Sequence, residues 1–197
     1  MFRSSRIVLA LGLATALATS TTTAHAETVP EAVQEGQAGG GAVGALALHE
    51  GELIDLAEDW GEAEVCIQQD EDAAVEFRCY DDDVSAAAGE GVGTADLRDC
   101  LVGTLCLWEN THFTGKRVQF QRAGTYNMAD YHGGFRDKIS SFHNDRNAGM
   151  TLVDFRSGII ADRKIDYLGK TVVANLGSVA YPDGGSWDNK TDRVIVK

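Results

Sequence analysis

The chain has 197 residues, four cysteines and a formal net charge of -13, and its charge is unevenly distributed. Residues 27–100 hold 20 acidic and 2 basic residues, which gives -18, whereas residues 101–197 hold 10 acidic and 13 basic residues, which gives +3. An acidic segment of this kind repels nucleic acid and favours solubility. We therefore expect no nucleic-acid partner, and a change in character near Cys100.

Residues 1–26 have the features of a secretory signal peptide. Two arginines precede an apolar run over residues 7–18, and Ala24-His25-Ala26 forms an A-x-A cleavage site. The apolar run is shorter than the roughly 20 residues that span a bilayer, and no later segment is apolar enough to do so. The sequence predicts a secreted, extracellular, monomeric protein that does not act on a membrane.

Residues 27–99 divide into three segments of different composition. Residues 27–47 are rich in Gly, Ala and Gln without aromatic residues, which indicates a flexible linker. Residues 48–83 form an acidic segment in which the β-type runs EVCIQ and VEFRCY flank an acidic turn, as in a hairpin. Residues 84–99 return to linker composition.

The four cysteines, Cys66, Cys79, Cys100 and Cys106, are an even number in a predicted extracellular protein, which indicates two disulfides. Three pairings are open from the sequence. We favour Cys66 with Cys79 and Cys100 with Cys106, because each pair is the nearest in sequence. Zinc is the rival use of the cysteines, but no C-x2-C spacing is present.

From Cys100 to the end, short runs of β-branched and aromatic residues alternate with Gly, Asn and Asp clusters. Strands at this spacing predict an all-β antiparallel sandwich or barrel over residues 100–197. Matches at nearly constant offset predict two copies of one supersecondary unit. The matched pairs are Gly115-Lys116-Arg117-Val118 with Gly169-Lys170-Thr171-Val172, Gly124-Thr125 with Gly177-Ser178, and Asp137-Lys138 with Asn189-Lys190.

Trp108, Phe113 and Gly115 form a W-x4-F-x-G motif, which is followed by Asp137 and, three and four residues later, by Ser140 and Ser141. This pattern resembles one Greek key of the βγ-crystallin superfamily, and implies a double Greek key sandwich over residues 100–197. In such a folded hairpin Gly115 takes a positive φ and the aromatics pack over it. The Cys100-x5-Cys106 entry behind a signal peptide is similar to secreted actinobacterial metalloproteinase inhibitors of βγ-crystallin fold.

The second repeat departs from the pattern. Tyr167-Leu168-Gly169 keeps aromatic-x-Gly, but Asp162 stands where the earlier aromatic is expected. Asp192 and Arg193 replace the two serines of the second loop. The second key is therefore not a copy of the first.

The resemblance implies that the protein inhibits a secreted protease through a preorganised loop, with a metalloprotease as the expected class of target. The expanded segment of the second key is the candidate for this loop, because it interrupts the repeat and offers apolar residues to a protease pocket. The alternative is that its two isoleucines pack in the core as strand residues. The candidate residues are Ser157, Gly158, Ile159, Ile160, Ala161 and Asp162.

The same resemblance implies calcium as the one candidate cofactor, and none is required. Oxygen donors of the two loops suit a hard cation. Arg136, Asp192 and Arg193 argue against binding, because they replace the expected acidic, amide or serine residues. The candidate ligands and loop-shaping residues are Glu109, Asp137, Lys138, Ser140, Asp188 and Asn189. A calcium-binding or structural extracellular module is thus the alternative to an inhibitor.

An enzyme is not expected. The chain has no G-x-S-x-G or H-E-x-x-H motif, and no cysteine with a plausible catalytic partner. Histidines without such a context more often face solvent than act in catalysis.

Overall fold

The computed structural model describes residues 44–71, 73–93, 100–131 and 135–197. The predicted signal peptide, most of the predicted linker over 27–47 and residues 94–99 of the second linker lie outside the described residues. No helix in the described ranges is long and apolar enough to cross a membrane.

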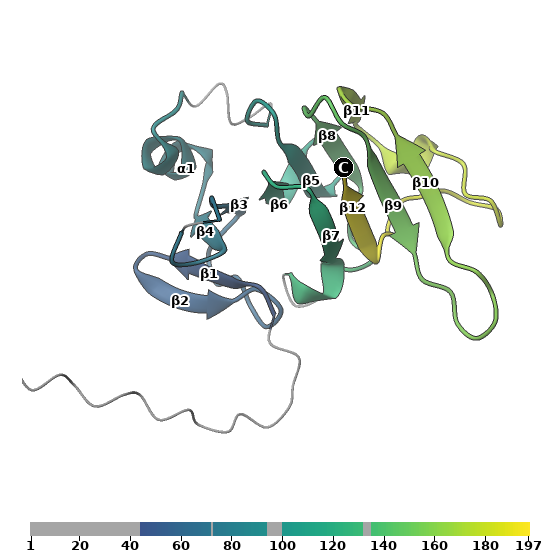
Figure 1. The fold of residues 1–197 in the computed structure, drawn as a ribbon, viewed down its shortest axis with the longest axis horizontal. Coiled ribbons are helices and arrows are strands. Elements are labelled where there is room, and N and C mark those ends of the chain that lie inside the picture. The colour runs from purple at the N-terminus through teal and green to yellow at the C-terminus, as the bar shows by residue number, and fades with distance from the viewer. Residues whose placement is uncertain (1–43, 72, 94–99, 132–134) are drawn as a thin grey trace, which may run out of the picture. The chain divides into compact units, whose positions relative to one another are not determined.

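The C-terminal part consists of two four-strand units that follow each other along the chain (Figure 1). The first unit contains β5 (Leu105–Asn110), β6 (Thr114–Phe120), β7 (Gly124–Asn127) and β8 (Ser141–Asn144). The second contains β9 (Met150–Asp154), β10 (Arg163–Tyr167), β11 (Thr171–Val173) and β12 (Arg193–Val196). Short 3-10 helices, η1 (Met128–Asp130) and η2 (Leu176–Ser178), follow the third strand of each unit.

The two units exchange their third strands. In the described residues, β5, β6 and β8 of the first unit share a sheet with β11 of the second, whereas β9, β10 and β12 share the other sheet with β7 of the first. All pairings among these eight strands are antiparallel. The arrangement is the double Greek key of the βγ-crystallins, which confirms the predicted fold class.

The acidic N-terminal segment extends the first of these sheets rather than standing apart. Its four strands are β1 (Leu46–His49), β2 (Glu52–Asp55), β3 (Val65–Gln68) and β4 (Phe77–Tyr80). The sheet order is β11-β8-β5-β6-β3-β4-β1-β2, so β3 pairs in parallel with β6, and β1 in parallel with β4. The predicted hairpin is present as β3 and β4, with Cys66 directly opposite Cys79.

Helix α1 (Asp83–Glu90) lies where the sequence indicated a linker. The side chain of Asp82 caps its first turn by accepting a hydrogen bond from the Ser85 amide at 2.7 Å. Gly91 ends the helix in the left-handed conformation, with φ at 69°. The Ala-rich composition that suggested a linker also favours a helix, because alanine has a high helix propensity. The N-cap at Asp82 favours the helix over the linker.

A single core joins the N-terminal segment to the first Greek key. Trp60 stacks on Phe135 with ring centroids 6.0 Å apart. Phe77 packs edge-on against Phe120 at 6.0 Å and against Tyr131 at 5.4 Å. Trp60, Phe77, Phe120 and Phe135 are completely buried, and full burial of each such side chain contributes about 2–3 kcal/mol.

Buried Arg117 adds a polar link between the same two parts. Its guanidinium forms an ion pair with Asp83 of α1 at 2.9 Å and lies over the Trp108 ring at 5.6 Å. Burial lowers the pKa of Arg117, and the charge of Asp83 opposes that shift. Because an unpaired buried charge is costly, α1 and β6 depend on each other.

Disulfides join Cys66 to Cys79 and Cys100 to Cys106, the two pairs that the sequence favours. The first ties β3 to β4, and the second closes the turn that leads into β5. No cysteine in the described ranges is free.

The repeat is real, but two of its three matched pairs are wrong. Asp137 and Asn189 do correspond, because each precedes the last strand of its unit by four residues and each has a positive φ, at 57° and 55°. The other matches pair different elements. Gly115 lies in the second strand of its unit, whereas Gly169 precedes the third strand of the next. The longer β9–β10 loop breaks the constant offset.

Candidate functional site

The predicted folded hairpin of the first key is present between β5 and β6. Trp108 packs edge-on against Phe113 with centroids 5.2 Å apart. His112, Phe113 and Gly115 all have positive φ, at 57°, 61° and 76°. The Ser141 hydroxyl accepts from the Phe113 amide at 3.1 Å and donates to the Asn110 carbonyl at 2.6 Å. The motif therefore builds a hairpin, and Ser141 holds it shut.

The second key does not use Tyr167 and Gly169 in this way. Tyr167 is the last residue of β10, and its ring packs on Phe142 at 4.6 Å. Gly169 lacks the positive φ that the fold of a hairpin requires. Glycine is needed there because a Cβ would lie 2.2 Å from the Asn147 carbonyl oxygen. The assignment of these residues to a second folded hairpin was wrong.

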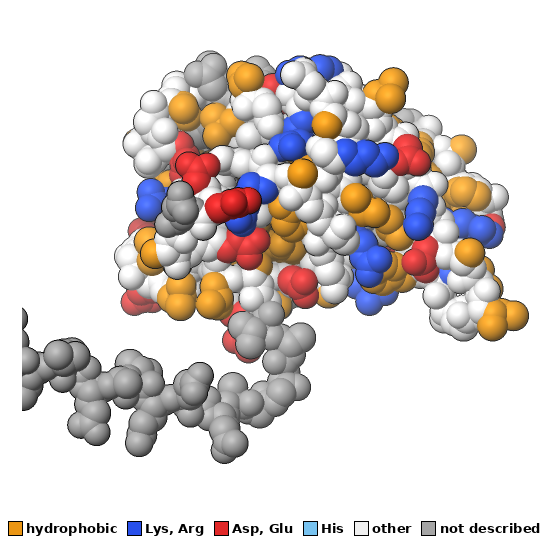
Figure 2. Space-filling view, in the orientation of Figure 1, with side chains coloured by type: hydrophobic (Ala, Val, Ile, Leu, Met, Phe, Trp, Pro, Cys, Tyr) orange, Lys and Arg blue, Asp and Glu red, His pale blue; other side chains and the backbone are white. Residues whose placement is uncertain are grey.

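The true counterpart of the folded hairpin is the β9–β10 loop, residues 155–162, which Figure 1 shows extending beyond its strands. Ile159 is fully exposed, at 105%, and Ile160 is 50% exposed, so neither packs in the core as the alternative interpretation held. Figure 2 shows hydrophobic side chains at the tip of the projecting loop, at the lower right. The tip of the loop is therefore both apolar and exposed.

Asp192 and Arg193 support the start of this loop. Asp192 is buried, and its carboxylate accepts hydrogen bonds from the Phe155 amide and from Nε of Arg136. The guanidinium of Arg193 lies over the Phe155 ring, 4.4 Å from its centroid, and that of Arg136 lies 5.6 Å from the same centroid. We call these four residues, Arg136, Phe155, Asp192 and Arg193, the Phe155 anchor.

Most of the predicted calcium residues lie in two loops that hydrogen-bond to each other. The Asn189 amide donates to the Ile139 carbonyl at 3.2 Å, and the Asp137 amide donates to the Thr191 carbonyl at 3.0 Å. The Ser140 hydroxyl donates to Oδ1 of Asn189 at 3.3 Å. Ser140 thus already has a partner within the fold.

Of the remaining three predicted residues, Lys138 and Asp188 lie in these two loops and Glu109 lies in β5. The amide of Lys138 donates to the Phe135 carbonyl at 3.2 Å. Oδ2 of Asp188 accepts from the Asn189 side chain at 3.4 Å. Glu109 is half-buried in β5, next to Trp108.

The structure assembles a different carboxylate cluster, made of Asp137, Asp154 and Asp192, with oxygens all within 4.8 Å of one another. Burial raises the pKa of Asp137, and the charges of Asp192 and Asp154 raise it further. Of the three, only Asp137 was a predicted ligand. Asp154 ends a strand that is distant in sequence, and Asp192 stood out only as a departure from the serine pattern.

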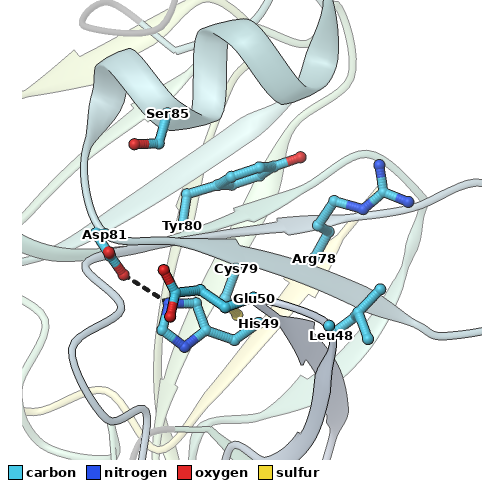
Figure 3. A pocket seen from close by; sticks show the side chains of 9 residues that line it. Leu48, His49, Glu50, Arg78, Cys79, Tyr80, Asp81 and Ser85 are labelled. Carbon is cyan, nitrogen blue, oxygen red and sulfur yellow. Dashed lines mark hydrogen bonds and ion pairs between the residues drawn. The ribbon is translucent and has the colours of Figure 1, made fainter.

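A separate pocket of about 290 Å³ lies beside β1, β4 and α1. Nε2 of His49 and Oδ1 of Asp81 form a hydrogen bond there at 2.6 Å (Figure 3). Ser85 also lines the pocket. Figure 3 shows a contact between His49 and Asp81 but none between either residue and Ser85. Nucleophilic catalysis requires a hydrogen-bonded nucleophile and base, and this pocket does not show such a pair.

The fold of residues 100–197 is that of a βγ-crystallin-type domain, and its β9–β10 loop projects with an apolar tip. Residues 93–152 match the model of peptidase inhibitor family I36. This segment covers the first key and the start of β9, and it ends before the β9–β10 loop. The match supports an inhibitor rather than an enzyme.

Solved structures of βγ-crystallins are similar to about half of the chain. Hahellin is 27% identical over 48% of this chain and 91% of its own, with a TM-score of 0.33. A βγ-crystallin from Ciona intestinalis is 23% identical over 48% of this chain and 100% of its own, with a TM-score of 0.33. A βγ-crystallin domain from Clostridium beijerinckii is 18% identical over 47% and 95%, with a TM-score of 0.32. No curated protein matches the chain.

Proposed function

We propose that this protein is a secreted inhibitor of a metalloprotease and that the β9–β10 loop docks in the protease cleft. The observation that carries the proposal is the match of residues 93–152 to a peptidase inhibitor family. Secretion is supported by the signal-peptide pattern and by two disulfides, which persist in oxidising compartments.

The loop has the properties that a substrate-like inhibitor needs. Its tip, Ser157 to Ala161, is exposed, so that it can enter a cleft without unfolding. Ile159 presents a large apolar side chain to a hydrophobic specificity pocket. Binding is tight when little conformational freedom is lost on docking, and a loop that is already ordered loses little.

Replacing Ile159 with Asp tests the docking residue. A charge in an apolar pocket is strongly disfavoured, so we expect the inhibition constant for a thermolysin-like metalloprotease to rise at least about 100-fold. Leu168→Asp is the matched control, because Leu168 is also apolar and 82% exposed but lies outside the loop.

Equal inhibition constants for the two variants would contradict the role of Ile159. Failure of the unaltered protein to inhibit metalloproteases, with inhibition of a serine protease instead, would correct the target class.

A calcium-binding extracellular module is the second candidate, and the carboxylate cluster favours it. The pKa of Asp137 is raised first by burial and then by repulsion from Asp192 and Asp154, and a divalent cation would relieve that repulsion. Arg136 and the Phe155 amide already occupy the carboxylate of Asp192, so we expect only weak, millimolar binding.

Calcium binding is tested by the melting temperature in calcium and in chelator. We expect a rise of a few degrees at about 10 mM calcium, and no rise in the Asp137→Asn variant. A calcium-dependent rise in a protein that inhibits no protease would establish the second candidate over the first.

A further inference from the structure

The neck of the β9–β10 loop is held by charged side chains. Asp183 accepts two hydrogen bonds from the guanidinium of Arg163, from Nε at 2.9 Å and from Nη2 at 2.7 Å. The same carboxylate lies 3.7 Å from Nη2 of Arg156. Arg156 stands near the start of the loop and Arg163 directly follows its end. One carboxylate therefore bridges both sides of the neck, and we call Arg156, Arg163 and Asp183 the Asp183 clamp.

Further contacts of Arg156 tighten the neck. Its Nη1 donates to the Tyr181 hydroxyl at 3.1 Å, and that hydroxyl donates to the buried carboxylate of Asp154. Its backbone amide donates to Oδ1 of Asp162 across the loop at 3.1 Å. Isolated exposed ion pairs contribute little, but a two-pronged arginine–carboxylate contact within a network is the favourable exception.

A rigid turn presents Asp183. Ala180 and Ser186 form an isolated β-bridge, and between them the Tyr181 amide donates to the Gly185 carbonyl at 3.1 Å. Gly184 and Gly185 have φ at 95° and 82°, a conformation that glycine adopts without strain. The backbone, rather than a flexible side chain, thus fixes where the clamp closes.

We propose that Asp183 is the positioning residue of the inhibitory loop and that its clamp restrains the loop, since the sequence has no cysteine after Cys106 that could do so through a disulfide. This inference rests on the proposed function. With both sides of the neck tied to one carboxylate, residues 157–161 enter a protease cleft in one conformation. If the protease cuts the tip, the clamp and the β9–β10 pairing keep the new ends together, so release is slow. Without the clamp, the protease is expected to cleave the loop and release it faster, as it does with a substrate.

The clamp predicts three coupled changes when Asp183 is replaced with Asn in the full-length protein. Deuterium exchange of the Arg156 amide, which donates to Asp162 across the neck of the loop, is expected to rise about tenfold, because the neck opens more often. The inhibition constant for a thermolysin-like metalloprotease is expected to rise about tenfold, and cleavage within the loop, followed by mass spectrometry, is expected to accelerate by a similar factor. Arg163→Gln removes the two-pronged donor and is expected to reproduce all three changes.

Asp166→Asn is the matched control. Asp166 lies in β10 and forms an ion pair with Lys197 at 2.8 Å, and it accepts a hydrogen bond from Thr151 rather than from the loop. All three quantities are expected to stay within about twofold in this variant. Melting temperatures identify any variant that fails to fold.

Unchanged exchange of the Arg156 amide in both folded clamp variants overturns the inference, whatever the protease data show. Unchanged inhibition and cleavage in these variants, with an unaltered protein that does inhibit, also overturns it but leaves the proposed function standing. If the unaltered protein inhibits no protease, the proposed function fails, and increased exchange of the Arg156 amide in the variants still supports the clamp.

Discussion

Asp192 occupies the position in the second key that Ser140 occupies in the first. The Ser140 amide donates to the carbonyl of Trp108 in β5, and the Asp192 amide donates to that of Val153 in β9. The next residues, Ser141 and Arg193, also correspond. In the first key the serine hydroxyl closes a short folded hairpin. In the second, a carboxylate and a guanidinium hold Phe155 at the base of a longer loop.

Gly169 illustrates a different residue-scale constraint. A Cβ there would lie 2.2 Å from the Asn147 carbonyl oxygen and 2.4 Å from its carbon, and backbone atoms cannot move away as a side-chain tip can. We expect Gly169→Ala to lower the free energy of unfolding by about 2–3 kcal/mol, as overpacking does.

The matched control for that prediction is Gly61→Ala. Gly61 has φ at 58° and open space around its Cα, so the substitution costs only the left-handed conformation, about 1 kcal/mol. Chemical denaturation of both variants measures the difference. A smaller decrease in the free energy of unfolding for Gly169→Ala than for Gly61→Ala would show that the backbone around Asn147 shifts to make room for the methyl group.

At the scale of elements, the strands of residues 100–197 could be predicted because β-branched and aromatic runs alternate with turn residues. The first hairpin of the N-terminal segment was not predicted, because its turn is Glu50-Gly51 rather than one of the Asn-Gly, Asp-Gly or Gly-Gly pairs typical of such turns; both residues have positive φ in the structure, at 49° and 87°. Helix α1 was not predicted, because its composition resembles that of a linker. Asp82 can be recognised as an N-cap only once the structure shows that its side chain accepts a hydrogen bond from the Ser85 amide in the first helical turn.

The candidate loop could be located because a repeat makes an insertion visible. The residues that hold the loop, namely the Phe155 anchor and the Asp183 clamp, could not be predicted, because the interacting side chains are distant in sequence. Asp183 lies 20 residues after Arg163, and Asp192 lies 56 residues after Arg136. The tertiary fold brings these partners together, and charge pairs over such separations leave no local pattern in a single sequence.

At the scale of the whole molecule, the N-terminal strands cover the β6 edge of the Greek-key domain and share its core. A chain that begins at Cys100 loses Trp60 and Phe77 and exposes the aromatic residues against which they pack. We expect its free energy of unfolding to fall by at least about 4 kcal/mol and the open β6 edge to promote self-association. Thermal melting and size-exclusion chromatography measure both effects.

Where the shortened chain remains folded, its inhibition constant is expected to match that of the full-length protein, since the loop, the Asp183 clamp and the Phe155 anchor all lie within residues 136–193. A monomeric shortened chain with an unchanged melting temperature would refute the role assigned to the N-terminal strands.

The parallel pairing of β3 with β6 also sets an order for folding. It joins Val65 to Arg117, residues 52 positions apart, and the closure of so long a loop must precede any gain from the pairing. Two-stranded hairpins are marginal on their own in water. The N-terminal segment is therefore expected to become ordered late, after β5 and β6 have formed the edge that receives it.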